Sequence, residues 1–231
     1  METPSPSDPG TRLYGRRAFL GVTALGISSL VWGKPVWDAF SRAARPIETA
    51  LPPSLVPNGW RIYTVASTMP TFDPATWRLK VDGSVASPFQ LTYRELLDLP
   101  ATDEIRTFHC VTGWSVPNVH WRGVRVSELI DRAQPTADGH VIGFVSAEYP
   151  YFDTLTLKQA QLQDAILAYQ MDGAPLAREH GAPVRLVIPE MYGYKNVKWV
   201  NRLVFGPRVV PGYWEQRGYD VDAWVGRSNG A

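Results

Sequence analysis

The chain has one cysteine, Cys110, in the string FHCVTGWSV, and a thiolate is a strong ligand for soft metals. A zinc site built from protein side chains needs several Cys or His ligands at characteristic spacings. The histidines are instead scattered, at positions His109, His120, His140 and His180. If Cys110 binds a metal, these residue types therefore indicate a site in which the protein supplies one sulfur and a non-protein group supplies the remaining donor atoms.

Two other interpretations of Cys110 stay open at this point. An isolated cysteine at a strand end is commonly a small buried hydrophobic residue. A nucleophilic cysteine, as in some hydrolases, would need a base close by, but His109 would point to the opposite face of a strand from Cys110. No disulfide can form within a chain that has a single cysteine. Other parts of the sequence are therefore needed to choose between these interpretations of Cys110.

A second group of residues suited to ligand binding lies in HGAPVRLVIP (180–189) and YGYKNVKWV (192–200). In the first string, alternation would send Arg185 to one face of a strand and residues 184, 186 and 188 to the other. Taken singly, Arg185 would belong to a surface ion pair, and Lys195 or Lys198 would lie on a solvated strand face. Their joint spacing makes the pair of strings a more specific signal than any of these residues alone, and arginine and backbone N–H groups are suited to binding phosphate.

Together these strings resemble the sulfite oxidase superfamily of molybdenum–pterin oxidoreductases, over about residues 57–207. The string CVTGWS, followed by WRGV, is similar to the metal-ligand segment of single-domain bacterial members. The resemblance implies that Cys110 is the catalytic residue and binds molybdenum beside the two sulfurs of one pterin dithiolene. It also implies that the molybdopterin is held by Asn58, Tyr63, Cys110, Ser146, His180, Arg185, Asn196, Val197 and Lys198.

The same resemblance implies a two-electron oxygen-atom transfer on a small sulfur- or nitrogen-oxo substrate, as an oxidation or as a reduction. Electrons would be exchanged with a separate protein, either a haem membrane subunit or a cytochrome. Vertebrate-type sulfite oxidases place arginines soon after the metal cysteine, whereas this chain reads VTGWSV, and His180 replaces an asparagine of the methionine-sulfoxide-reducing relatives. The resemblance therefore assigns no substrate. The alternative is a metal-free exported binding or scaffold domain of the same fold.

The pattern of apolar residues predicts an α+β domain, mainly β, over residues 58–231, with short connecting helices. The resemblance implies the mixed sheets of the sulfite-oxidase-type molybdopterin-binding fold. A capping box at Thr92 and Glu95 starts one short helix, and Asp172-Gly173 predicts a hairpin turn. A second short helix is expected over residues 127–133. Strands are expected at 77–83, 104–111, 139–147, 165–171, 184–188 and 196–205.

Residues 1–42 have the layout of an export signal, in which Arg16 and Arg17 precede the uncharged run 18–32. The string RRAFLG resembles a twin-arginine signal, which would deliver the folded protein through the twin-arginine translocon to the periplasm or another extracytoplasmic site. An ordinary secretory signal and a retained N-terminal membrane anchor are the alternatives. Residues 43–57 read as a proline-containing linker.

The overall charge excludes one class of partner. Lys and Arg number 23 against 22 for Asp and Glu, and no basic run is present. A nucleic-acid-binding surface needs clustered positive charge. We therefore expect a small-molecule substrate and a protein redox partner, and no nucleic acid.

Overall fold

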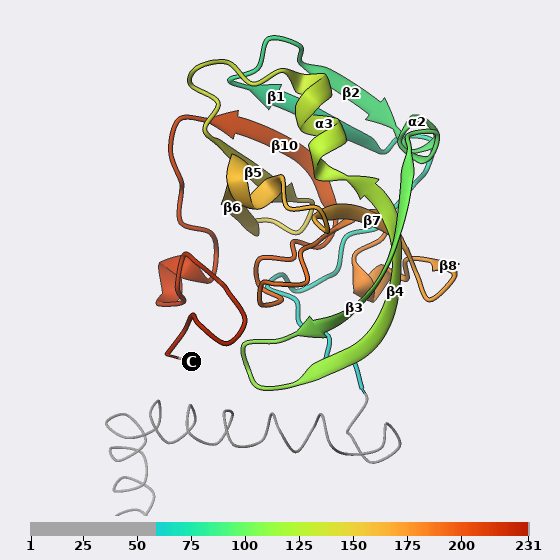
Figure 1. Cartoon of the computed structure of the whole chain (residues 1–231). Coiled ribbons are helices and arrows are strands. Elements are labelled where there is room, and N and C mark those ends of the chain that lie inside the picture. Colours follow the sequence, from blue (N-terminus) through green and yellow to red (C-terminus); the bar gives the residue numbers. More distant parts are fainter. Residues whose placement is uncertain (1–58, 231) are drawn as a thin grey trace, which may run out of the picture. The chain divides into compact units, whose positions relative to one another are not determined.

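The computed structural model describes residues 59–230 (Figure 1). The expected export signal (1–42), the linker (43–57) and Asn58 lie outside these residues. Within residues 59–230, no helix is long and apolar enough to cross a membrane. The helices and strands described below all lie within residues 58–231, the range expected for the oxidoreductase domain.

The first sheet has five strands in the order β2-β1-β10-β5-β6. The strands are β1 (Arg78–Gly83), β2 (Phe89–Thr92), β5 (Val141–Ser146), β6 (Phe152–Thr156) and β10 (Val200–Gly206). Strands β1 and β10 are parallel, and the other neighbours are antiparallel. Along β1, alternation buries Leu79 and Val81, whereas Lys80 between them forms a surface ion pair with Asp82. One face of this sheet is thus directed at the core.

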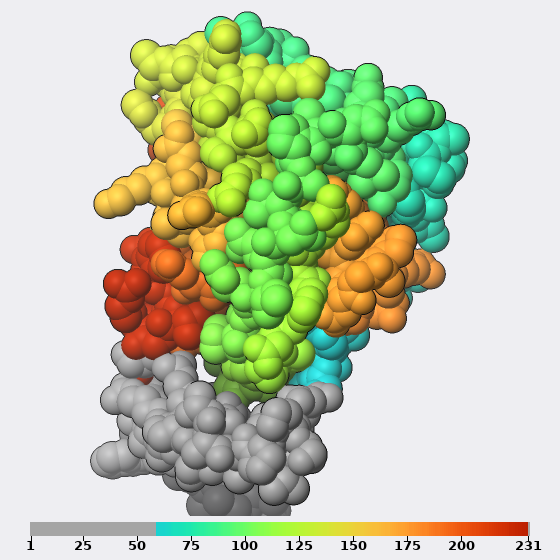
Figure 2. Space-filling view, turned by 45° about the vertical axis from the view of Figure 1, so that its right-hand side comes forward, coloured from blue at the N-terminus to red at the C-terminus, as the bar shows by residue number. Residues whose placement is uncertain are grey.

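The second sheet has the order β3-β4-β7-β8, and β9 also pairs with β7. The strands are β3 (Ala101–His109), β4 (Ser115–Arg125), β7 (Ile166–Met171), β8 (Ala174–Pro175) and β9 (Arg185–Val187). Figure 2 shows β3 and β4, in green, on one face of the domain, with the C-terminal segment in red to one side of them. Cys110 directly follows β3, and Lys198 lies in the loop that leads into β10.

Short helices and turns connect the strands. The helices are α2 (Tyr93–Leu97), α3 (Val126–Ala133), α4 (Leu157–Ala160), and the 3-10 turns η1 (Arg178–His180) and η2 (Glu215–Arg217). The predicted capping box is present, because the Thr92 side chain accepts from the Glu95 N–H and the Glu95 side chain accepts from the Thr92 N–H. Helix α3 buries Leu129 and Ile130 in the core that the two sheets share.

The second sheet separates two hydrophobic clusters. The larger cluster lies between the sheets and includes Leu167 of β7 and Leu186 of β9. The smaller cluster lies on the opposite face of the second sheet and includes Trp121 of β4 and Val187 of β9. Because successive side chains of β9 alternate between these clusters, Arg185 lies on the side of the smaller one.

The α+β, mainly β fold predicted from the sequence is confirmed, with differences in detail. The strand expected over 196–205 is wrong at its start, since β10 begins at Val200. Residues 196–199 form a loop, and Trp199 there has φ 52°, in the left-handed region that no strand allows. The hairpin at Asp172-Gly173 is present, but its second arm, β8, has only two residues because Pro175 cannot donate to a ladder.

Candidate functional site

A cavity joins segments that are far apart in the sequence. Its empty space, including open solvent at the mouth, is about 920 Å³. It is lined by residues of 60–65, 108–114, 148–151, 179–185, 193–198 and 214–219. The predicted site residues that line it are Tyr63, Cys110, His180, Arg185, Asn196 and Lys198. The cysteine string and the two downstream strings singled out in the sequence therefore meet at one cavity.

Cys110 is the first residue after β3 and is held in a tight turn. Its N–H donates to the carbonyl of Trp114 (2.9 Å), and its carbonyl accepts from Gly113 N–H (3.1 Å). Gly113 has φ 91°, which a glycine adopts without strain. Burial raises the pKa of the Cys110 thiol, and hydrogen bonds from Thr112 oppose that rise. The turn thus presents a half-buried sulfur to the cavity.

The cysteine turn and the loop 192–198 touch directly. Gly193 N–H donates to the carbonyl of His109 at 2.8 Å, one residue before Cys110. A Cβ at Gly193 would lie 2.4 Å from the ring of Phe108, so any side chain there would push the loop away from β3. Glycine at this position therefore allows the close approach that brings the cysteine and the basic loop to one site.

Arg185 on β9 is 3% exposed. Its Nη atoms donate to the carbonyls of His180 (3.2 Å) and Asn196 (3.3 Å). The guanidinium also lies over the rings of Phe108 (5.3 Å) and Trp121 (5.2 Å). Burial lowers its pKa to about 10, which leaves it charged at neutral pH. Among residues 59–230 it forms no ion pair with an acid, so the interpretation as a surface ion pair is wrong.

A second cation and a histidine flank Arg185. Lys198 Nζ donates to the carbonyls of Tyr63 (2.7 Å) and Glu179 (3.1 Å). Burial, with a smaller effect of the Arg185 charge, lowers the pKa of Lys198 to about 8. The same two causes, burial first, lower the pKa of His180 from its ordinary value. The imidazole is therefore neutral near pH 7 and can donate from one ring nitrogen.

Asn196 uses its side chain to shape the loop. Its Oδ1 accepts from Ile188 N–H (2.6 Å), and its Nδ2 donates to the carbonyls of Met191 (3.2 Å) and Tyr192 (3.2 Å). Val197 does not line the cavity, as far as the described residues define it; its side chain lies in the larger core cluster. These two residues hold the backbone around Arg185 in place.

Ser146 has a comparable supporting position and is not among the described residues that line the cavity. Its hydroxyl donates to the carbonyl of Lys198 (2.7 Å) and accepts from Glu148 N–H (2.9 Å). The Glu148 carboxylate in turn accepts from Val65 N–H (2.8 Å) and from the Thr64 hydroxyl. This chain of contacts fixes the segment that carries Tyr63.

Unsatisfied polar atoms provide a test of whether the cavity fits a molybdopterin. In the described part of the chain, five buried side-chain nitrogen or oxygen atoms lack a hydrogen-bond partner, and three of them belong to cavity residues: Trp114 Nε1, His180 Nδ1 and Arg185 Nε. Buried polar atoms without partners are costly. No cluster of three or more His, Cys, Asp or Glu side chains within 59–230 could hold a metal ion. Nitrogen donors, two cations and a single sulfur fit an anionic cofactor that carries its own metal donors.

Several residues of the site carry no signal in the sequence that predicts their role. Arg61 lines the cavity and is exposed, and Glu148 lines it from a buried position. Thr112 was only part of a string, although its hydroxyl lies 3.1 Å from Cys110 Sγ. The short segment around Arg61 has no periodic pattern, and the partners of Glu148 lie more than 80 residues away in the sequence. No local signal could have identified these two residues.

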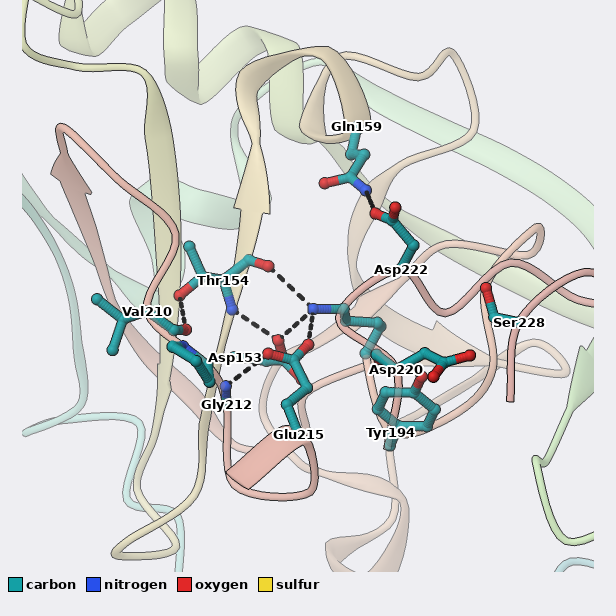
Figure 3. A network of polar contacts seen from close by, with 12 residues as sticks. Asp153, Thr154, Gln159, Tyr194, Val210, Gly212, Glu215, Asp220, Asp222 and Ser228 are labelled. Atoms are coloured by element: carbon teal, nitrogen blue, oxygen red, sulfur yellow. Dashed lines mark hydrogen bonds and ion pairs between the residues drawn. The ribbon is translucent and has the colours of Figure 1, made fainter. Parts of the chain in front are cut away.

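The interpretation of Lys195 as a solvated residue is wrong, because this side chain is fully buried. Its Nζ donates to Asp153 Oδ1 (2.6 Å) and the Thr154 carbonyl (3.1 Å), and it also contacts the Glu215 carboxylate (Figure 3). Glu215 Oε2 accepts from Gly212 N–H (2.7 Å). This cluster, hereafter the Lys195 cluster, ties the loop 192–198 to β6 and to the C-terminal segment.

The Lys195 cluster contains two carboxylates for one ammonium group, all of them buried. Burial raises the pKa of Asp153 to about 7, and the Glu215 charge adds to the rise, against the opposing effect of Lys195. The Asp153 carboxyl therefore binds a proton in the folded state at pH values where it is ionised in the unfolded chain.

The domain that contains this cavity is similar to known proteins. Residues 66–214 match the model of the oxidoreductase molybdopterin binding domain. The chain is 35% identical over 155 residues to the uncharacterized oxidoreductase YuiH of Bacillus subtilis, covering 66% of this chain and 77% of YuiH. It is 28% identical over 160 residues to the protein-methionine-sulfoxide reductase catalytic subunit MsrP of Campylobacter jejuni, covering 62% of this chain and 54% of MsrP.

Among solved structures, the sulfane dehydrogenase SoxCD from Paracoccus pantotrophus is similar, with a TM-score of 0.61 and 25% identity. The match covers 66% of this chain and 44% of the SoxCD chain. The chain thus spans about half the length of MsrP and less than half of the SoxCD chain. The similarity covers the domain that contains the cavity.

The pH dependence of stability tests the Lys195 cluster. Because the pKa of Asp153 is raised in the folded state to about 7, the folded state holds a proton that the unfolded state has lost, and stability falls as pH rises from about 4 to about 7. We expect the melting temperature of the wild type to fall over this range by roughly 5–10 °C more than that of Asp153→Asn. Parallel curves for the two proteins, measured by thermal unfolding between pH 4.5 and 8, would contradict the raised pKa.

Proposed function

The chain belongs to the oxidoreductase molybdopterin-binding domain family of the sulfite oxidase superfamily, and on that premise we propose that it transfers an oxygen atom to or from a small sulfur- or nitrogen-oxo substrate. The observation that carries the proposal is the buried guanidinium of Arg185, which lines the cavity without an acidic partner among the described residues. A buried charge of this kind needs an anion, and the phosphate of a pterin cofactor is such an anion.

The site residues predicted from the sequence then have the following proposed tasks. Cys110 would bind the molybdenum through its thiolate. Arg185 and Lys198 would neutralise the phosphate, and His180 would donate to the pterin or its phosphate. The proposed set of cofactor contacts is completed by Tyr63, Asn58 and the backbone of Asn196 and Val197. Ser146 would support the site by donating a hydrogen bond to the backbone carbonyl of Lys198.

The bound molybdenum cofactor would supply the two-electron redox chemistry, and the protein would supply binding and exclusion of water. The aromatic rings around the cavity suit the second task. Trp60 lies at the centre of them, with ring centroids 4.9 Å from Phe108 and 6.2 Å from Trp114. Trp114 is 8% exposed and lines the cavity beside the cysteine turn. We propose that these rings shape the space in which the substrate meets the metal.

We further propose that electrons pass to or from a separate protein, either a haem membrane subunit or a cytochrome. The name of MsrP, a catalytic subunit, supports a divided arrangement for that relative. The string RRAFLG supports export by the twin-arginine translocon to a periplasmic or other extracytoplasmic location. The N-terminal segment would then be cleaved or would stay as an anchor.

Metal and pterin analysis tests the proposal directly. Protein produced in a host that makes the cofactor should contain about one molybdenum and one pterin per chain, and Cys110→Ala should abolish oxygen-atom transfer while the pterin and the fold are retained. The measurements are metal analysis, pterin fluorescence after oxidation, and turnover of dimethyl sulfoxide or sulfite with dye electron carriers. Wild-type protein without molybdenum would instead favour the metal-free scaffold domain.

Arg185→Ala tests the phosphate contact. Removing one partner of a desolvated charge pair costs about 2–5 kcal/mol, so cofactor affinity should fall some thirty-fold to several-thousand-fold. Arg202→Ala is the matched control, because Arg202 forms an exposed pair with Asp82 and is itself 45% exposed, and such pairs contribute under about 1 kcal/mol. Molybdenum content should drop in the first variant and stay near the wild-type level in the second. A full metal complement in Arg185→Ala would refute the contact.

Replacing Arg16 and Arg17 with lysine tests the export route. The twin-arginine translocon recognises the paired arginines, so cofactor-loaded protein should accumulate in the cytoplasm. Cell fractionation followed by immunodetection measures the distribution, and Arg12→Lys, which lies before the motif, serves as the control. Normal delivery of the double variant would favour the ordinary secretory route.

A further inference from the structure

The hydroxyl of Thr112 lies 3.1 Å from the sulfur of Cys110. Both residues belong to the tight turn described above, which two backbone hydrogen bonds between Cys110, Gly113 and Trp114 close. No other side chain of residues 59–230 forms a hydrogen bond with the sulfur, and the Thr112 hydroxyl has no second partner among them. Among the described residues, the Cys110 sulfur is therefore the hydrogen-bond partner of this hydroxyl.

The chemistry of the two groups sets the direction of this hydrogen bond. In the free thiol either atom can donate, but a thiolate bound to a metal has no proton, so only the threonine hydroxyl can donate. Threonine is branched at Cβ, which restricts its χ1 angle and limits the positions that the hydroxyl can take. A thiolate ligand at Cys110 would therefore accept a hydrogen bond from the Thr112 hydroxyl where the two atoms now lie.

From this geometry we propose that Thr112 sets the reduction potential of the metal by donating a hydrogen bond to the Cys110 thiolate. The inference rests on the proposed function, because it takes Cys110 as the metal ligand. A donor to a ligand sulfur withdraws electron density from the bond to the metal and stabilises the reduced state. Thr112 is accordingly a positioning and tuning residue that acts through the sulfur, and the residue type at this position selects how readily the centre accepts electrons.

The test uses the cofactor-loaded wild type with Thr112→Val and Thr112→Ser. Valine keeps the shape of threonine without the hydroxyl, whereas serine keeps the hydroxyl. The midpoint potential is measured by a redox titration monitored by electron paramagnetic resonance, and molybdenum content is measured in the same samples. We expect Thr112→Val to shift the reduction equilibrium about tenfold or more toward the oxidised state, which is about 30 mV more negative for a two-electron couple. Thr112→Ser should stay near the wild-type potential, with equal metal content in all three.

Other outcomes are distinguishable. Equal potentials in the wild type and Thr112→Val, with full molybdenum in both, would overturn the inference and leave the proposed function intact. A changed KM for dimethyl sulfoxide with an unchanged potential would also overturn it, by assigning the hydroxyl to substrate contact. Wild-type protein without molybdenum would overturn both proposals. If Thr112→Val does not retain cofactor, Thr112→Ala removes the same hydroxyl with less bulk, and the same shift is expected.

Discussion

The cost of burying the Arg185 guanidinium is the constraint on which the rest of the site depends. A charge removed from water must be compensated, and here two backbone carbonyls and two aromatic faces do so only in part. Those carbonyls belong to His180 and Asn196, so the turn η1 and the loop 192–198 must both close around β9. The Nε atom of Arg185 is left without a hydrogen-bond partner among the described residues, and an anionic ligand would supply the missing acceptor. Folding and ligand binding are thus linked through one side chain.

Local signals in the sequence were sufficient for much of the fold. The alternation in residues 184–188 correctly placed Arg185 opposite to Leu186, because a two-residue period is a property of any strand. The capping box at Thr92 and the turn at Asp172 also depend only on neighbouring residues. Periodicity does not indicate which distant parts of the chain come together. The resemblance to the sulfite oxidase superfamily supplied that information, because it predicted that the cysteine string and the strings 180–189 and 192–200 share a site.

Features that depend on distant partners were not predictable. Lys195 is a charged residue of a type that is mostly exposed, yet its acids are 42 and 20 residues away, and its burial follows from their positions. The loop at 196–199 has a local cause, because the side-chain amide of Asn196 binds the backbone of the turns just before it in place of a strand partner. Ser146 stabilises the site through a carbonyl, a contact that its residue type alone does not specify.

The parallel pairing of β1 with β10 has a consequence for synthesis of the chain. Strand β10 lies between β1 and β5, so the first sheet lacks its central strand until residues 200–206 have left the ribosome. Pairing strands from opposite ends of a domain is a long-range event that forms late in folding. The loop 192–198, which directly precedes β10, can therefore be ordered only after translation of nearly the whole domain. A cofactor held by this loop would enter a completed chain, before any transport step that requires a folded passenger.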